Sequence, residues 1–318
     1  MTPFTPQQLS SWGVADWGYT ELLEPQSIDH LKTWVARGDA ASISYMQDHR
    51  LELRTQIPDH LLAGGQSALV FLFPYYTKLW QTSHSKLNIS AMAVGFGGED
   101  YHFPIKQQLD QIALQIKNTH PTINYRACVD TAPLMERDLA FRAGLGFFGK
   151  NSMLISRRAG SFTIIGSLLL DQKLDLRIRT SDRDHCGHCR RCVDACPTNA
   201  INSDRTINSN RCISYYTTHL FSEADPPDGL VKGEFLYGCD LCQLACPWNR
   251  TETTDPKDKL PGPENQTLHN FFFQRPVSEV VAELQTMSNR RFRRIFAQTS
   301  LERVGRLGVL KNLIQVDE

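Results

Sequence analysis

The spacing of the cysteines constrains this chain more than any other feature of its sequence. Eight of the nine cysteines fall between residues 186 and 246. The first four follow the pattern C-x2-C-x2-C-x3-C-P, and the last three repeat it without its first cysteine. The eight positions are Cys186, Cys189, Cys192, Cys196, Cys212, Cys239, Cys242 and Cys246. A disulfide scaffold is not expected, because a chain of 318 residues can build a core without such cross-links.

This spacing predicts two [4Fe–4S] clusters of the bacterial two-cluster ferredoxin type, in which the fourth cysteine of each run binds the other cluster. One cluster then takes the first three cysteines together with Cys246. The other takes Cys196, Cys239 and Cys242, and Cys212 is the candidate for its missing ligand. Two four-cysteine zinc sites are the alternative, since paired C-x2-C motifs also suit zinc. The full spacing and the two Cys-Pro dipeptides favour clusters.

Composition places the chain among ordinary globular proteins. Hydrophobic residues make up 41% of it and charged residues 21%, and its length suggests two or three domains. The formal net charge is zero, so any nucleic-acid site must be a local basic patch. The N-terminus lacks the features of a signal peptide, and no run approaches the length of a membrane span. We therefore expect a cytoplasmic protein with no membrane partner.

The segment before the cysteines mixes helices and strands. Residues 1–50 are expected to be helical, and the apolar run 67–73 reads as a buried central strand. Apolar residues keep helical spacing over 105–116, and a strand at 126–130 precedes a helix over 134–142. No strict strand–helix–strand repeat is present, so the pattern predicts an α+β fold.

The rest of the chain supplies one further strand signal, two loops and a helical end. Residues 161–170 read as one long strand or a pair. The segments 222–229 and 251–263 are rich in turn residues and are expected to be loop and linker. The last 55 residues are expected to be helical. We place the domain boundaries at 1–175, 176–255 and 256–318.

A glycine-rich stretch, residues 144–150, matches G-x-G-x-x-G by letter. It follows a predicted helix instead of opening one after a strand, and no acidic ribose partner is evident, so a dinucleotide site is not favoured. The glycines are expected to allow close approach of the backbone to a large cofactor or to another strand.

Several longer motifs carry a resemblance to one family. They are Val129-Asp-Thr-Ala-Pro-Leu-Met-Glu-Arg137, Gly144-Leu-Gly-Phe-Phe-Gly-Lys-Asn151, Ala159-Gly-Ser-Phe162, Arg211-Cys-Ile-Ser-Tyr215 and Tyr237-Gly-Cys-Asp-Leu-Cys-Gln-Leu-Ala-Cys-Pro-Trp-Asn249. Together they resemble epoxyqueuosine reductase, over roughly residues 40–315. The resemblance implies a cobalamin-dependent enzyme with two [4Fe–4S] clusters, which removes the epoxide oxygen of epoxyqueuosine in the tRNA anticodon loop. It also implies a nitroreductase-like cobalamin-binding α/β domain, a ferredoxin-like domain and a short helical region that would begin a HEAT-like segment.

The resemblance also implies roles for particular residues. Asp130 is expected to donate the proton to the departing oxygen, and its position between apolar neighbours suggests a raised pKa. The alternative for Asp130 is an N-cap of the helix that follows it. Contacts with cobalamin are expected from Arg54, His102, Asp130, Lys150, Asn151 and Tyr215. Arg54 could instead be a surface charge, and His102 a structural histidine. Lys150 and Asn151 could instead anchor the glycine loop, and Tyr215 could pack against a cluster.

The expected partners are tRNA containing epoxyqueuosine and a low-potential electron donor, with the enzyme acting as a monomer. The C-terminal helices carry many basic residues, which could follow tRNA phosphates or form a solvated face. The tRNA contacts are expected from Arg190, Arg191, His219, Arg291, Arg293 and Arg294. Tyr215 and Tyr216 could stack on unpaired bases or pack against a cluster.

Two other functions fit the cysteine pattern less well. Reductive dehalogenation of a small organic halide would not need the basic C-terminal helices. A simple electron carrier would not need some 180 residues ahead of the clusters.

Overall fold

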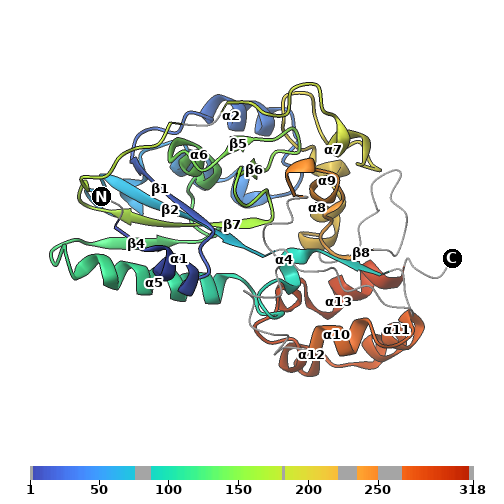
Figure 1. The fold of residues 1–318 in the computed structure, drawn as a ribbon. Helices are drawn as coiled ribbons and strands as arrows, with labels where there is room; N and C mark the ends of the chain where they lie inside the picture. Colours follow the sequence, from blue (N-terminus) through green and yellow to red (C-terminus); the bar gives the residue numbers. More distant parts are fainter. Residues whose placement is uncertain (1–2, 76–86, 181–182, 221–234, 250–266, 315–318) are drawn as a thin grey trace.

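A four-stranded antiparallel sheet forms the centre of the N-terminal half (Figure 1). The computed structural model describes residues 3–75, 87–180, 183–220, 235–249 and 267–314. The strand order is β1 (Asp16–Glu21), β2 (Ser67–Pro74), β7 (Thr163–Leu170) and β4 (Tyr125–Cys128). Each neighbouring pair runs antiparallel, so the sheet belongs to a mixed α+β architecture rather than a doubly wound one.

The central strand β2 is apolar throughout because helices cover both faces of the sheet. Leu69, Phe71 and Phe73 pack toward α5 (His102–Lys117), whereas Ala68 and Val70 face α6 (Glu136–Arg142). Successive side chains of a strand point to opposite faces, so a strand buried on both sides shows no polar alternation. Figure 1 shows α5 on one side of the sheet and α6 on the other.

The expectation of an all-helical segment over residues 1–50 is wrong in one stretch. This segment holds α1 (Pro6–Ser11), α2 (Ile28–Ala36) and α3 (His49–Arg54), but the edge strand β1 lies between the first two. Trp17 and Tyr19 of β1 alternate with Gly18 and Thr20 and pack into the core on the α5 side. Pairing with β2, some 50 residues later in the chain, fixes this strand, and no local signal reports such pairing.

The glycine stretch lies where the chain leaves α6 and enters a short hairpin. Gly144 ends the helix with φ of 70°, and the hairpin pairs β5 (Phe147–Phe148) with β6 (Leu154–Ile155). A Cβ on Gly146 would lie 2.3 Å from the carbonyl oxygen of Ile155. The glycine therefore serves close approach to another strand, one of the two expected uses.

The cysteine segment folds into short helices joined by turns. They are α7 (Arg191–Asp194), η3 (Ser209–Arg211), α8 (Ile213–Thr218), α9 (Leu241–Leu244) and η4 (Pro247–Asn249). One strand of this region, β8 (Phe235–Tyr237), pairs in parallel with β3 (Asn88–Ile89), which precedes α4 (Ala91–Val94). The predicted loops 222–229 and 251–263 lie outside the described residues.

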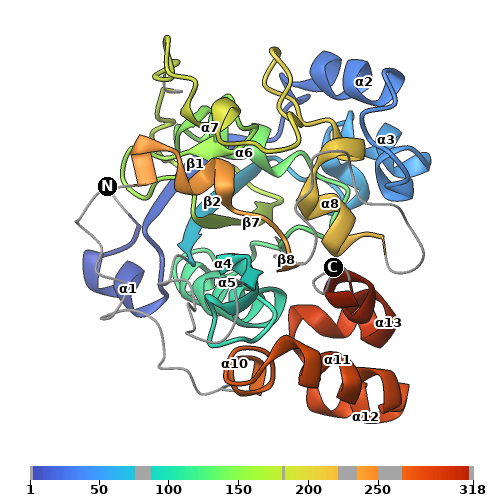
Figure 2. The ribbon, with the colours of Figure 1, turned by 90° about the vertical axis from the view of Figure 1, so that its right-hand side faces the viewer.

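The C-terminal residues form a helical layer, as expected. Its helices are α10 (Thr267–Phe272), α11 (Val277–Thr286), α12 (Asn289–Ile295) and α13 (Ser300–Ile314). Its apolar core, which includes Phe272, Phe292 and Phe296, is continuous with Ile89 of β3 and Leu236 of β8. The helices thus dock on the rest of the molecule along α13, as Figure 2 shows from the side. No helix in the described ranges is both long enough and apolar enough to cross a membrane.

Candidate active site and cysteine centres

Asp130 lies in the loop that follows the edge strand β4. Its backbone takes φ of 56°, a left-handed conformation that is uncommon outside glycine and asparagine, and its amide donates to Glu136 Oε1 at 2.8 Å. Its side chain is 57% exposed, but one carboxylate oxygen accepts a hydrogen bond from the Tyr101 hydroxyl at 2.7 Å. The N-cap of α6 is Met135, so Asp130 is not a helix cap. The loop therefore presents a carboxylate that is held by protein groups and remains open to a ligand.

His102 lies between two carboxylates. Its Nδ1 is 2.5 Å from Asp100 Oδ1, and its Nε2 is 3.7 Å from Asp130 Oδ2. Nε2 is buried and has no hydrogen-bond partner among the described residues. The rings of Tyr101 and His102 stack at 4.2 Å, which fixes the orientation of the imidazole. The side chains form a connected array from Asp100 through His102 to Asp130.

The charges in this array differ from the expectation for Asp130. Burial alone would raise the pKa of Asp130, but the nearby charge of His102 and the hydrogen bond from Tyr101 outweigh it and leave this pKa lowered. Burial alone would lower the pKa of His102, but the two carboxylates raise it to about 9. Burial and the negative charge of Asp130 raise the pKa of Glu136. At neutral pH His102 and the neighbouring Glu136 therefore carry protons while Asp130 does not, and the predicted raised pKa of Asp130 is wrong.

Side chains from three further parts of the chain surround the array. Tyr45 donates to or accepts from His219 Nε2 at 2.9 Å, and Arg303 of α13 donates to the hydroxyl of Tyr237 at 3.2 Å. Arg303 is solvent-exposed, yet its charge lowers the pKa of both Asp130 and His219. The charges of these side chains affect one another's pKa, and we call the surface formed by Tyr45, Asp130, His219 and Arg303 the polar recess.

The residues expected to contact cobalamin occupy three different settings. His102 and Asp130 border the polar recess. Arg54 is buried and donates to the carbonyl oxygens of Tyr45 and Arg50, and the hydroxyl of Tyr215 meets that of Ser42 at 2.5 Å. Arg54 and Tyr215 thus fix the positions of the backbone and side chains next to Tyr45 in the recess.

The other two expected cobalamin contacts lie against the cysteine segment. The Lys150 ammonium donates to the carbonyl oxygens of Gly187 and Cys189, at 2.7 and 2.8 Å. Asn151 is 2% exposed, and its amide nitrogen lies 3.5 Å from the carbonyl oxygen of Cys242. Both side chains thus connect the glycine stretch to the cysteine runs.

The eight cysteines form two electrostatic groups that follow the crossed pattern. Burial raises the pKa of Cys192, and the neighbouring thiols of Cys186 and Cys246 raise it further. Burial likewise raises the pKa of Cys246, and the thiols of Cys186 and Cys189 raise it further. In the second group, burial and then Cys212 and Cys196 raise the pKa of Cys239 to about 12. The first group holds three thiols of the first run and Cys246, whereas the second holds Cys239 and Cys242 with Cys196 and Cys212.

The donor set of each group fits an iron–sulfur cluster. All eight thiols are free of disulfides. Around one tetrahedral zinc ion, four sulfurs would converge to about 3.8 Å from each other. Within the described ranges, no three Cys, His, Asp or Glu side chains converge closely enough to hold a single metal ion. A cubane spreads its four ligands over four irons, so it does not require the sulfurs to converge on one ion.

The residues expected to contact tRNA divide into separate sets. Arg190 and Arg191 are exposed at α7, whereas Arg291, Arg293 and Arg294 are exposed on α12. The two helices lie far apart, with α7 in the upper part and α12 at the bottom of both Figure 1 and Figure 2.

The remaining candidates for base contacts lie inside the fold or at the recess. His219 borders the polar recess, as described above. Tyr215 and Tyr216 are 9% and 2% exposed, so they pack inside the fold instead of stacking on bases. Lys311 is held by the carbonyl oxygens of Tyr216 and Leu220 and is not part of an exposed basic face.

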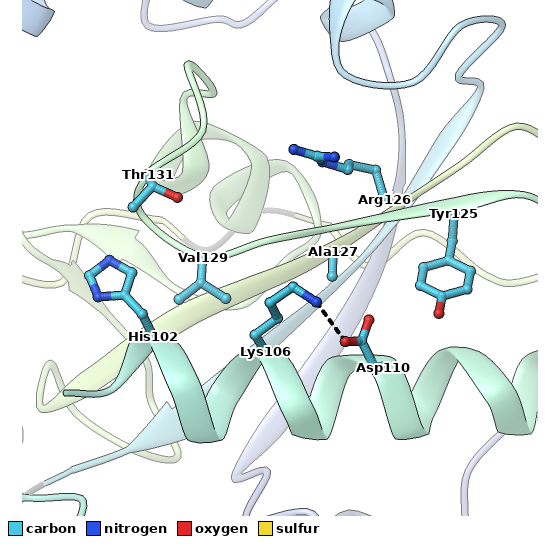
Figure 3. A pocket seen from close by; sticks show the side chains of 8 residues that line it. All are labelled: His102, Lys106, Asp110, Tyr125, Arg126, Ala127, Val129 and Thr131. Atoms are coloured by element: carbon cyan, nitrogen blue, oxygen red, sulfur yellow. Dashed lines mark hydrogen bonds and ion pairs between the residues drawn. The ribbon is translucent and has the colours of Figure 1, made fainter. Parts of the chain in front are cut away.

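An open groove runs beside the Asp130 loop, between α5 and the edge strand β4 (Figure 3). Its volume is about 400 Å³, and its lining includes His102, Val129 and Thr131 next to the array. Further along, Lys106 and Asp110 form an ion pair at 2.7 Å that spans one turn of α5. The groove thus reaches His102 from the side of the sheet edge.

Sequence reasoning missed three members of the site. Tyr101 precedes the predicted His102, and Glu136 lies in a motif already quoted, but neither position shows its contact with Asp130. Arg303 was counted only as one of many basic residues in the C-terminal helices. Its position beside Asp130 depends on how α13 docks, which no motif reports.

Known proteins resemble this chain over nearly its whole length. Residues 54–131 match the family described as epoxyqueuosine reductase QueG, and residues 185–249 match the 4Fe-4S double cluster binding domain. An epoxyqueuosine reductase of Cyclobacterium marinum is 35% identical over 305 residues, covering 95% of this chain and 90% of its own. The enzyme of Salmonella typhimurium is 37% identical over 314 residues, covering 96% of this chain and 78% of its own.

Solved structures give the same result. An epoxyqueuosine reductase crystallised with an epoxyqueuosine-modified tRNA-Tyr stem loop aligns with a TM-score of 0.79 at 26% identity, covering 96% of this chain and 78% of that one. The enzyme of Streptococcus thermophilus aligns with a TM-score of 0.75 at 25% identity, with the same coverage. On the strength of these similarities and of its double-cluster cysteine pattern, the chain belongs to the epoxyqueuosine reductase family.

Proposed function

We propose that the protein reduces epoxyqueuosine to queuosine in the anticodon loop of tRNA, drawing electrons through two [4Fe–4S] clusters to a cobalamin at the polar recess. Removing one oxygen atom as water consumes two electrons and two protons. The observation that carries this proposal is the position of Asp130, an open carboxylate backed by His102 and Tyr101 beside the cysteine segment. A reaction on tRNA also agrees with a cytoplasmic location.

The cysteine groups supply a path for the electrons. Cys186, Cys189, Cys192 and Cys246 would hold one cluster, and Cys196, Cys212, Cys239 and Cys242 the other. Cys212 is the residue from which α8 begins, and the same helix carries Tyr215, which packs on the wall of the recess. With Cys212 as a ligand, the second cluster would lie on the side of the cysteine segment that meets the recess.

We place cobalamin at the polar recess on chemical grounds. Its corrin ring provides its own nitrogen ligands to cobalt, so the site needs polar contacts rather than a protein metal-ligand set. The buried, unpartnered Nε2 of His102 and the exposed carboxylate of Asp130 are polar groups of this kind. When bound, the cofactor supplies the low-potential chemistry that cleaves the carbon–oxygen bond. His102 and Asp130 would meet it or the substrate directly, while Arg54 and Tyr215 support the wall.

The proton for the departing oxygen comes from the array. Asp130 is the exposed member and delivers the proton at its carboxylate, and the imidazolium of His102, 3.7 Å away, replaces it. Because the two groups share one proton, they titrate as a pair and not as independent residues. Asp100 holds the imidazole at Nδ1 and stabilises its charged form. The Tyr101 hydroxyl keeps the Asp130 carboxylate in place.

The test is turnover of the reconstituted enzyme under anaerobic conditions. The substrate is tRNA from cells blocked at the epoxide stage, and nucleoside analysis measures the conversion to queuosine. Asp130→Asn should keep cluster and cobalamin binding but lose about 100- to 10,000-fold in turnover, the usual contribution of a general acid. Asp29→Asn, an exposed position on α2, is the matched control. No conversion by fully loaded wild-type enzyme, or normal turnover of Asp130→Asn, would contradict the proposal.

A further inference from the structure

Two groups of basic residues lie in parts of the surface that the fold keeps apart. The α12 surface consists of Arg290, Arg291, Arg293 and Arg294. The α7 surface consists of Lys150, Arg183, Arg190, Arg191 and Arg205, with the acids Asp184 and Asp194. In both ribbon views α7 and α12 lie in opposite parts of the molecule. One compact partner would have to span the whole protein to use both surfaces.

The α7 surface surrounds the first cluster. Every residue from 183 to 191 is exposed, except Cys186 and Cys189 themselves, which are half-buried. Lys150 binds the carbonyl oxygens of Gly187 and Cys189, so its positive charge lies within this loop. Of the acids, Asp184 is paired with Arg205 at 2.6 Å, and Asp194 lies 3.5 Å from Arg190. The surface keeps a positive excess next to the cluster ligands.

The second cluster is more deeply enclosed. The neighbours Gly238, Asp240 and Gln243 of its ligands Cys239 and Cys242 are all buried. Cys212, a third ligand, lies at the start of α8, beside the recess. Electrons therefore enter at the α7 surface, pass to the enclosed cluster and leave toward the recess.

We propose that the α7 surface is the docking site of the electron donor, an acidic protein that carries one electron at a low potential, and that tRNA uses the α12 side. This inference rests on the proposed function, because it needs the two clusters to feed the recess. Each docking event passes one electron and oxidises the donor by one electron. Two events supply the two electrons that, with two protons, release the oxygen as water.

The size and charge of the surface suit such a partner. Electron-transfer encounters bury little area and are short-lived, so they depend on charge steering more than on apolar contact. A basic surface around an exposed cluster speeds the approach of an acidic donor, and salt weakens the effect. A negatively charged tRNA could also be attracted to these arginines, so the experiment must separate the two partners.

The experiment uses the reconstituted holoenzyme and two double variants. The first is Arg190→Glu with Arg191→Glu, and the matched control is Arg293→Glu with Arg294→Glu. Iron content and the electron paramagnetic resonance of the reduced clusters verify that both variants are loaded. Stopped-flow absorbance then measures cluster reduction by an acidic flavodoxin in its hydroquinone form, without tRNA. Turnover of tRNA with dithionite as reductant gives KM for tRNA independently of any docking protein.

The α7 variant should be reduced by flavodoxin about 10- to 100-fold more slowly at low salt, and the difference should shrink at high salt. Its KM for tRNA with dithionite should stay within about twofold of wild type, whereas the α12 variant should show the reverse pattern. Unchanged reduction by flavodoxin would overturn the proposal, and so would a raised KM for tRNA in the α7 variant. Cluster reduction is measured without substrate, so a failure of the proposed reaction would not be confused with a failure of docking.

Discussion

Replacing His102 by glutamine tests whether the array stores the proton for the reaction. In the wild-type enzyme the carboxylates of Asp100 and Asp130 raise the pKa of His102 to about 9. The His102–Asp130 pair therefore keeps its proton below that pH and loses it as the pH rises through about 9. Turnover should be level near neutral pH and fall above it.

The size of the effect follows from the loss of a positioned proton source, which contributes about 100- to 10,000-fold to a rate. Without the imidazolium, no neighbouring His102 returns a proton to Asp130 near neutral pH. Turnover of His102→Gln should therefore fall by about 100-fold or more at pH 7.5. It should recover as the pH is lowered, because the carboxyl group then takes up its proton directly from solvent.

The assay is a pH–rate profile of tRNA conversion under single-turnover conditions, with cobalamin and iron content measured for each sample. His120→Gln, an exposed histidine just beyond α5, is the matched control and should keep the wild-type profile. A loss of the same size at every pH would mean that His102 acts only through structure. A wild-type rate and profile in His102→Gln would refute the relay altogether.

Three further predictions concern the clusters and the fold. Cys212→Ser should reduce the iron content from about eight to about four per chain, because it removes one ligand of the second cluster, and an unchanged content would exclude Cys212 as a ligand. Gly18→Ala should lower the free energy of unfolding in urea by about 1 to 3 kcal/mol, since its Cβ would lie 2.2 Å from the carbonyl oxygen of Ala143; an unaltered midpoint would show that the helix can shift. Arg142→Ala should cost roughly 3 to 5 kcal/mol in the same assay, because it removes the cation that lies 2.8 Å from the buried Asp138 carboxylate and leaves that charge only its hydrogen bonds from Ser27; a cost below about 1 kcal/mol would contradict that account.

The sequence predicted those helices and strands whose own residues show a clear hydrophobic pattern. The apolar run of β2, the helical spacing of α5 and the strand before Asp130 were all predicted and are all present. The strand β1 was missed, because its six residues gain their stability from pairing with β2 rather than from a strong local preference. The C-terminal helices were expected, but their core shared with β3 and β8 was not.

The site divides in the same way. Asp130 and His102 were both expected to contact the cofactor, and the structure connects them through Tyr101 and shows Asp100 behind the imidazole. The distribution of charge was predicted incorrectly, since Asp130 was expected to hold the proton by virtue of its apolar neighbours. The side chains that decide its pKa come from a loop 30 residues earlier, and only their distances show which group is charged.

The sequence by itself determined the double-cluster domain and predicted its cysteine ligands, because thiols that share a cluster must recur at spacings that a short backbone segment can meet. It also determined the central strand and the family. Only the tertiary structure determined how the polar recess is formed, because its side chains come from segments spread over most of the chain. These segments are α3, the Asp100–His102 segment, the Asp130 loop, α8 and α13. It also decided that the basic residues form two separate surfaces, because the position of a helix on the molecule depends on packing, which no count of arginines can reveal.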